Sequence, residues 1–170
     1  MSEDQNLVSV DDLAIEPFIV DQVTVKLLTL LDLSEYMEPI KLAIRLAYGT
    51  HFKERHATNI VGKLMSAHSH CWAVFSREDP RLLGFMIADI RRSDLFDAQG
   101  LYISLISLME GVRLSENAYR QCLGVLKSYA EQTECAMLFA ETINMDLAHV
   151  AGKLGFTCFA AILKMDLTDA

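Results

Sequence analysis

Two carboxylates stand at places in the sequence where acid–base chemistry is feasible. Glu110 follows the apolar segment 102–109, and Glu141 lies among apolar residues in the segment 136–142. A carboxyl group removed from water has a raised pKa and can accept a proton near neutral pH, so both are candidate general bases. A carboxylate at a strand end also commonly pairs with a nearby Arg or Lys, and this purely structural role is the alternative for each.

Other residue types with chemical potential lack the spacing that their chemistry needs. Four of the five histidines fall between positions 51 and 70 without a His-x-x-x-His pair, which favours hydrogen-bonding or packing roles over a metal site. The four cysteines make no Cys-x-x-Cys pair and lie among apolar residues, as reduced, buried thiols do. Ser104 and Ser107 lack the Gly-x-Ser-x-Gly setting of a nucleophile elbow. We therefore predict neither a metal site nor a nucleophilic serine.

Alternating strands and helices must position these side chains. Apolar runs that are rich in β-branched residues predict strands, and apolar residues at helical spacing predict helices that begin at capping residues. The expected strands are 23–30, 71–75, 82–90, 102–109, 136–142 and 157–167, and the expected helices are 32–49, 55–68, 115–132 and 145–154.

The order of these elements predicts an α/β fold. A strand–helix–strand sequence implies parallel pairing, whereas the hairpin of 71–75 with 82–90 is antiparallel. A mixed, twisted central sheet with helices on both faces follows. Segment 102–109 is expected to be a central strand that alternates in part, with Tyr102, Ser104 and Ile106 against Ile103, Leu105 and Ser107.

Composition limits the possible functions. The chain has 170 residues and is 52% hydrophobic, enough for one packed domain at 21–170 behind an acidic N-terminal arm at 1–20. A formal charge of −8 disfavours nucleic acid as a partner, because phosphate contacts need clustered cations. No apolar run approaches the ~20 residues of a membrane span, and no signal peptide opens the chain. We expect a cytoplasmic protein with no membrane partner.

Asn144 precedes the last helix, Gly155-Phe156 follows it, and Leu83-Gly84-Phe85 puts a Gly-Phe pair in the strand 82–90. These three motifs and the element order resemble the GNAT acetyltransferase superfamily, whose third strand carries a similar pair. The resemblance implies that acetyl-CoA lies in a V between the fourth and fifth strands. It also implies a pyrophosphate on the backbone N–H groups at the start of the third helix, where the dipole favours anions.

The resemblance assigns cofactor-binding and catalytic positions, several of which depart from the family pattern. Anchoring on Leu123 puts Ser115 at the family's Arg or Gln, and puts Ala118 and Arg120 at its two small residues. Arg120 then either obstructs the cofactor or binds its phosphate. Ala151 stands where many members carry an acid tyrosine, and an alanine cannot donate that proton. The implied cofactor-binding residues are Met109, Gly111, Ser115, Ala118, Arg120 and Asn144, and the implied bases are Glu110 and Glu141.

Two functions from different classes follow. The first is an N-acetyltransferase that moves acetyl from acetyl-CoA to the amine of a small molecule or a protein. The second is a GNAT-shaped protein that has lost catalysis and serves as a structural or partner-binding module, for example one encoded by a phage or associated with a virion. The second function implies a homo-oligomer or a protein partner.

Overall fold

The computed structural model describes residues 17–94, 96–140 and 145–157 in two compact units, Met1–Phe139 and Ala140–Ala170. Apart from Thr157, the predicted strand at 157–167 lies outside the described residues, as do Glu141 and Asn144.

The first unit is built on a central sheet. The strands are β2 (Val23–Leu27), β3 (His70–Ser76), β4 (Leu82–Ser93), β5 (Ala98–Leu108) and β7 (Met137–Ala140), in the order β2-β3-β4-β5-β7. The pairs β2–β3, β3–β4 and β4–β5 are antiparallel. A helix connects β5 to β7, the connection that parallel neighbours require. The predicted central position of β5 is confirmed.

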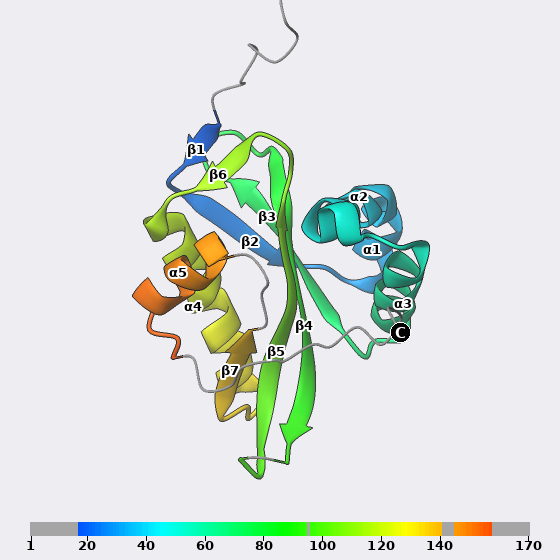
Figure 1. Cartoon of the computed structure of the whole chain (residues 1–170), viewed down its shortest axis with the longest axis vertical. Helices are drawn as coiled ribbons and strands as arrows, with labels where there is room; N and C mark the ends of the chain where they lie inside the picture. The colour runs from blue at the N-terminus through cyan, green and yellow to red at the C-terminus, as the bar shows by residue number, and fades with distance from the viewer. Residues whose placement is uncertain (1–16, 95, 141–144, 158–170) are drawn as a thin grey trace, which may run out of the picture. The chain divides into compact units, whose positions relative to one another are not determined.

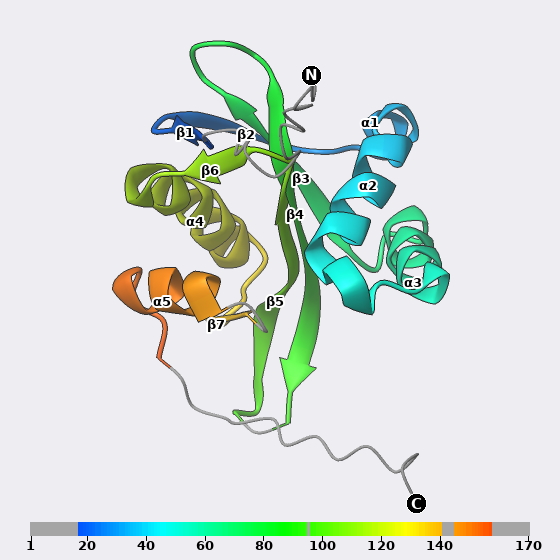
Figure 2. The same ribbon diagram turned by 45° about the horizontal axis from the view of Figure 1, so that its top comes forward.

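Helices cover both faces of this sheet, as predicted (Figure 1). The helices α1 (Leu30–Glu35), α2 (Met37–Tyr48) and α3 (Glu54–Met65) lie on one face, and a short 3-10 turn, Gly49–His51, joins α2 to α3. The helix α4 (Glu116–Gln132) lies on the other face (Figure 2). The core beneath α1–α3 consists of Leu28, Leu33, Ile40, Ala43, Ile44, Ala57, Leu64, Cys71, Ala73, Phe85, Ile87 and Leu105.

The helix predicted at 32–49, with Asp32 or Ser34 as its cap, is two helices, and its N-cap is a different residue. Thr29 is the N-cap of α1, and its hydroxyl accepts a hydrogen bond from the Asp32 N–H. Asp32 is the third helical residue and returns its carboxylate to the Thr29 N–H at 2.8 Å, which completes a capping box. Pro39 falls in the first turn of α2, where the missing N–H costs nothing.

The α4 side of the sheet is closed by aromatic and small side chains. The Trp72 and Tyr129 rings meet edge to face with centroids 5.0 Å apart. Ser115 caps α4 as predicted, because its hydroxyl accepts from the Ala118 N–H at 3.2 Å. Cys122 is buried here, and Cys71 is buried under α1–α3, as predicted for packed thiols.

A β-bulge interrupts β5 at Ser104. Ile87 of β4 pairs with Leu105 while the next residue, Ala88, pairs with Ile103, so Ser104 is the extra residue. Neighbouring strand residues point to opposite faces, and Ile103 and Leu105 therefore face opposite sides of the sheet. The predicted alternation is wrong at this point, because the inserted residue changes the face to which the following side chains point. Tyr102, Ser104 and Ile106 therefore do not share one face, and neither do Ile103, Leu105 and Ser107.

A second, two-stranded parallel sheet was not predicted. It pairs β1 (Phe18–Val20) with β6 (Val112–Leu114), and both strands are only three residues long. The Phe18 N–H donates to the Gly111 carbonyl at 2.8 Å, and the Ser115 N–H donates to the Val20 carbonyl at 2.9 Å. The chain just after residue 17 therefore lies beside the segment that leads into α4.

The described part of the second unit is the helix α5 (Met145–Lys153) and its C-terminal cap. The Phe156 N–H donates to the Ala151 carbonyl at 3.0 Å, and the Gly155 N–H donates to the Gly152 carbonyl at 3.1 Å. These two bonds are a Schellman motif, which confirms Gly155 as the residue that ends this helix. None of the helices in the described part of the chain is long and apolar enough to cross a membrane.

Candidate active site

A polar pocket opens in the first unit, on the face of the sheet that α2 and α3 cover. Its volume is about 220 Å³. The bulge residue Ser104 and its neighbour Ile87 lie on the sheet side, where the Ser104 hydroxyl donates to the Ile87 carbonyl at 3.2 Å. The described lining residues are Tyr48, His56, Asn59, Ile60, Lys63, Ser69, Ile87 and Ser104.

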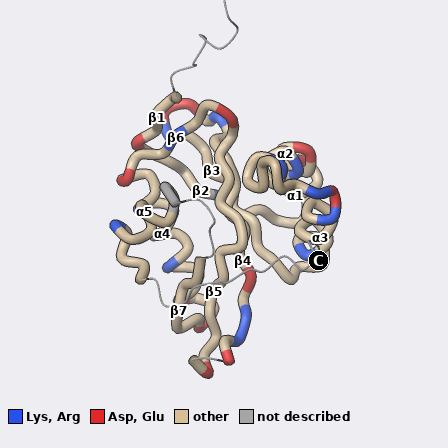
Figure 3. The backbone as a smooth tube through the Cα atoms, in the orientation of Figure 1, with Lys and Arg blue, Asp and Glu red and all other residues tan. Residues whose placement is uncertain are grey.

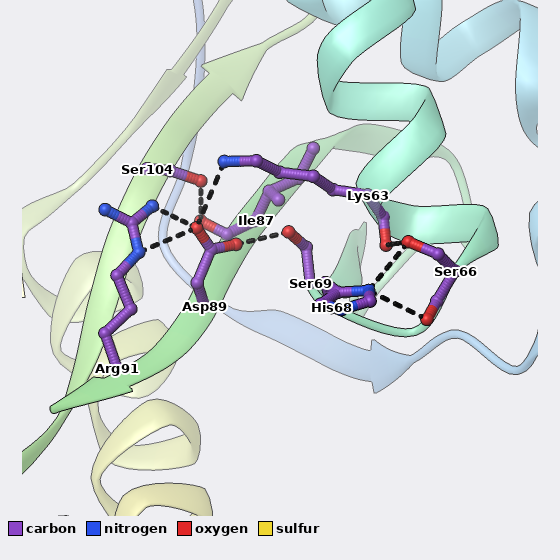
Figure 4. Close-up of polar contacts among 8 residues, drawn as sticks. All are labelled: Lys63, Ser66, His68, Ser69, Ile87, Asp89, Arg91 and Ser104. Carbon is purple, nitrogen blue, oxygen red and sulfur yellow. Dashed lines mark hydrogen bonds and ion pairs between the residues drawn. The ribbon is translucent and has the colours of Figure 1, made fainter.

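A buried carboxylate, Asp89, organises the polar groups beside this pocket (Figure 4). Asp89 is only 4% exposed, and it accepts short hydrogen bonds from the Ser69 hydroxyl and the Arg91 guanidinium. The Lys63 ammonium lies 3.7 Å from the same carboxylate. Burial raises the pKa of Asp89, but the hydrogen bonds from Arg91 and Ser69 outweigh burial and hold the pKa below its usual value. Asp89 is therefore an ionised anchor and a poor base at neutral pH.

His56 presents a defined hydrogen-bonding face. Its Nδ1 accepts a hydrogen bond from the Lys53 N–H at 3.1 Å at the start of α3, and its ring stacks on Tyr48 with centroids 4.3 Å apart. Because Nδ1 is an acceptor, the neutral ring carries its hydrogen on Nε2. His56 can therefore donate one hydrogen bond from Nε2. The predicted hydrogen-bonded role is confirmed, while its place on the pocket wall was not foreseen.

A second carboxylate, Asp21, sits at the start of α4. Its side chain accepts from the Ser115 hydroxyl at 2.6 Å and from the Asn117 amide at 3.2 Å. The Gln121 amide also donates to the Asp21 main-chain carbonyl at 3.3 Å. Figure 3 shows acidic and basic positions close together around β1, β6 and this end of α4. The negative charge of Asp21 thus already lies at the positive end of the α4 helix dipole.

The turn between β5 and β6 carries three of the predicted site residues. The Val112 N–H donates to the Met109 carbonyl at 3.1 Å, and Gly111 has φ +74°, which is the signature of a type II turn. Glu110 is exposed in this turn, and Met109 packs against the core under α1–α3. Glu110 is therefore exposed to water, and not enclosed among apolar residues as a buried base would be.

The predicted residues on α4 take ordinary helical roles. Ala118 is fully buried, and its N–H is committed to the Ser115 cap. Arg120 forms an ion pair with Glu116 at 2.6 Å, one turn earlier on a half-exposed surface. Of the residues that the resemblance implies, the structure brings Met109, Gly111 and Ser115 close together in the chain segment that also meets β1.

The pocket residues Ser69, Lys63 and Ser104 were missed from the sequence, and so was Asp89. One signal was available for Asp89: it is a lone carboxylate in the run Phe85–Ile90, where every other side chain is apolar. A charge in such a strand must be paired or functional. Nothing local marks the bulge at Ser104. Among the described residues, no group of three or more His, Cys, Asp or Glu side chains is placed to hold a metal ion.

Comparisons with known proteins identify the fold. No protein-family model matches the sequence, and no curated protein matches it. Solved structures do match. The aminoglycoside N-acetyltransferase AAC(6')-Iy, in complex with a bisubstrate analogue of CoA and acetylneamine, has a TM-score of 0.67 and 14% identity over 85% of this chain and 97% of its own.

Two further structures agree. A ribosomal-protein-alanine N-acetyltransferase from Brucella melitensis has a TM-score of 0.62 and 15% identity, over 86% of this chain and 99% of its own. An acetyltransferase from Trypanosoma brucei has a TM-score of 0.55 and 16% identity, over 86% of this chain and 100% of its own. The predicted architecture is confirmed: the chain has the fold of the GNAT acetyltransferases.

Proposed function

We propose that this chain is an N-acetyltransferase whose acceptor amine binds in the pocket at Ser104. The observation that carries the proposal is the β-bulge in β5, which opens onto that polar pocket. Bulges are frequent next to active sites, because they re-aim side chains and bend the strand. In the GNAT fold this strand borders the cofactor, so a pocket at its bulge is suitably placed for the second substrate.

The pocket offers hydrogen-bonding groups that suit an amine. The Ser104 hydroxyl donates its hydrogen to the Ile87 carbonyl, and the Ser69 hydroxyl donates its hydrogen to the Asp89 carboxylate. Their oxygen lone pairs are then left to accept N–H groups of an acceptor. His56 adds a donor from Nε2. Two acceptors at fixed positions hold the amine through its N–H groups and leave its lone pair free for the acyl group. The His56 donor then serves another acceptor atom of the substrate.

Acetyl-CoA, when bound, supplies the activated acetyl group. The turn residues Met109 and Gly111 and the cap residue Ser115 would hold it, whereas the Ala118 N–H is committed to the Ser115 cap and Arg120 is paired with Glu116. The open φ of Gly111 and the start of a 17-residue helix suit a phosphate. The Asp21 carboxylate, which accepts a hydrogen bond from the Ser115 hydroxyl, would repel a phosphate at this place. The residues therefore fit the cofactor, with an affinity that Asp21 lowers.

Proton removal from the amine needs a base or a relay through water. Glu110 and Glu141 stay the proposed bases, and the exposed position of Glu110 suits transfer to water better than direct abstraction. Ser69 and Ser104 contribute by orienting the amine, not by taking its proton. The net reaction forms an amide C–N bond and releases the CoA thiol, which carries the proton that the amine loses.

Thermal unfolding of the full chain with and without acetyl-CoA tests the proposal. A ligand at ~100 times its Kd stabilises the native state by about 2.7 kcal/mol. For a chain of this size that raises Tm by roughly 5–10 °C. The control is the same concentration of acetate and ATP, which share parts of the cofactor. An unchanged Tm with millimolar acetyl-CoA would sink the proposal.

A further inference from the structure

We infer that the acceptor is a small amine that also carries a carboxylate, and that Lys63 binds this carboxylate. The inference rests on the proposed function, because it names the substrate class for the same pocket. It is carried by the arrangement of Lys63, Asp89 and Arg91 at the pocket wall. Figure 4 shows the Lys63 side chain reaching from α3 to the sheet beside Asp89.

Lys63 has unused hydrogen-bonding capacity. Its ammonium is 3.7 Å from Asp89 Oδ2, too far for a hydrogen bond, and within the described part of the chain it donates none. The Asp89 oxygens are already taken: Oδ1 accepts from Ser69, and Oδ2 accepts from Arg91 Nε at 3.1 Å and from Arg91 Nη2. Lys63 therefore keeps its three N–H donors for another acceptor, and its side chain is 53% exposed.

The charge balance favours an anion. One carboxylate, Asp89, lies between two cations, Lys63 and Arg91, and Asp89 itself is almost completely buried. The described residues that line the pocket include Lys63 and no Asp or Glu. Lys63, Arg91 and Asp89 together carry one net positive charge beside the pocket, which attracts an anionic group and repels a polycation.

The size of the pocket limits the rest of the acceptor. Its volume of about 220 Å³ is below the roughly 300–1,000 Å³ of sites for drug-sized ligands. Ile60 and Ile87 supply the apolar part of the lining, and Asn59 and the Tyr48 ring stand beside them. An amino acid has the matching features: one amine, one carboxylate and a short side chain. A multi-ring polyamine such as neamine matches neither the volume nor the charge.

Ligand-observed NMR titrations of the full chain test this inference without the cofactor. The probes are alanine, leucine and glycine, each as the free acid and as its carboxamide, with neamine as the polycation. The carboxamides keep the amine and lose only the negative charge. We expect the free acids to bind roughly ten-fold more tightly than their carboxamides, as a charge-assisted hydrogen bond predicts.

Variants assign that preference to a residue. Lys63→Met should abolish the preference for the free acids. The matched control is Lys41→Met, which removes an exposed lysine paired with Glu38 on α2 and should leave the preference intact. Tighter binding of carboxamides or neamine, a preference that survives Lys63→Met, or no binding of any free acid at ~10 mM would each overturn the inference.

The acetyl-CoA unfolding shift, measured on the same samples, separates the two proposals. A Lys63-dependent preference without any acetyl-CoA shift would support the pocket inference and contradict acetyl transfer. A clear shift combined with tighter binding of neamine would support acetyl transfer and overturn the inferred substrate class.

Discussion

Two aspartates in the first unit hold polar clusters of opposite character. Asp89 is buried in β4 and lies between Arg91 and Lys63, so its surroundings carry a net positive charge. Asp21 lies at the start of α4, bonded to the neutral side chains of Ser115 and Asn117, and it adds a negative charge there. The first cluster favours an anionic ligand beside the bulge, and the second disfavours one at the helix start.

The difference shows how one residue type acts through its neighbours. A buried carboxylate that faces two cations is ionised, and the three groups together keep one net positive charge. A carboxylate that is paired with a helix dipole takes the place that an external anion would occupy. In an acetyltransferase the first arrangement would set acceptor choice, and the second would set cofactor affinity.

Gly84→Ala should have the largest effect, because it disrupts the pairing of β4, the strand that carries Asp89, with β5. A Cβ at Gly84 would lie 2.2 Å from the Ser107 carbonyl oxygen and 2.9 Å from Leu108 Cα, both of them backbone atoms of β5. Backbone atoms of a paired strand can shift only at a high energetic cost, so we expect the unfolding free energy to fall by about 3 kcal/mol. Urea unfolding measures it.

Gly124→Ala is the control for this change. Gly124 lies inside α4, where an added Cβ meets nothing within 4 Å, so the alanine should stabilise the chain by about 0.5–1 kcal/mol. Equal effects of the two alanines would show that β4 and β5 do not approach each other closely at Gly84.

Deleting Ser104 should separate folding from function. Without it Ile103 and Leu105 become consecutive, and they already pair with the consecutive residues Ala88 and Ile87. The ladder then becomes regular and every flanking side chain keeps its face. We expect a folded protein by circular dichroism with acetyl transfer lowered at least about a hundred-fold, since misplacement by ~1 Å has that cost. Full activity in the deletion variant would exclude the bulge as part of the site.

Asp89→Asn should weaken the fold moderately and in a pH-dependent way. The amide keeps a partner for Ser69 but loses the charge that faces Arg91, and we expect a cost of about 2 kcal/mol at neutral pH. The pKa of Asp89 is lowered in the folded protein, so its contribution is complete above the unfolded value of about 3.9. It disappears as the pH falls through the lower, folded pKa.

Unfolding by urea at a series of pH values checks this sign. The gap between wild type and Asp89→Asn should be constant near neutral pH and close in acid. A gap that widens as the pH falls would mean that Asp89 is protonated in the folded protein.

Asp21→Asn should give the smallest and most specific effect. The amide oxygen still accepts from Ser115, while one negative charge leaves the start of α4. We expect acetyl-CoA to bind about three-fold more tightly, as removal of one partly screened like charge allows. Asp79→Asn, in the exposed turn before β4, is the control for net charge. Equal gains from both variants would place Asp21 away from the cofactor.

The sequence predicted the fold better than the site. Periodicity and capping residues located most of the helices and strands, and Ser115 and Gly155 end up in their expected roles. The bulge could not be predicted, because an inserted residue changes the pairing without leaving a local pattern around Ser104. The residues around Asp89 come from separate elements: Lys63 from α3, Ser69 from the segment before β3, and Asp89 itself from β4. Their proximity follows only from the sheet register, which the sequence does not show. Asp21 reaches α4 across some ninety residues of chain for the same reason.

The most direct test of the central claim is whether the full chain acetylates a small amine. Wild type and the Ser104 deletion are incubated with acetyl-CoA and a panel of amino acids, and the products are analysed by mass spectrometry. We expect an N-acetylated amino acid with wild type and at least about a hundred-fold less product with the folded deletion variant. Acetyl-CoA that stays intact with wild type and every amine would contradict this expectation, and so would equal product from both proteins.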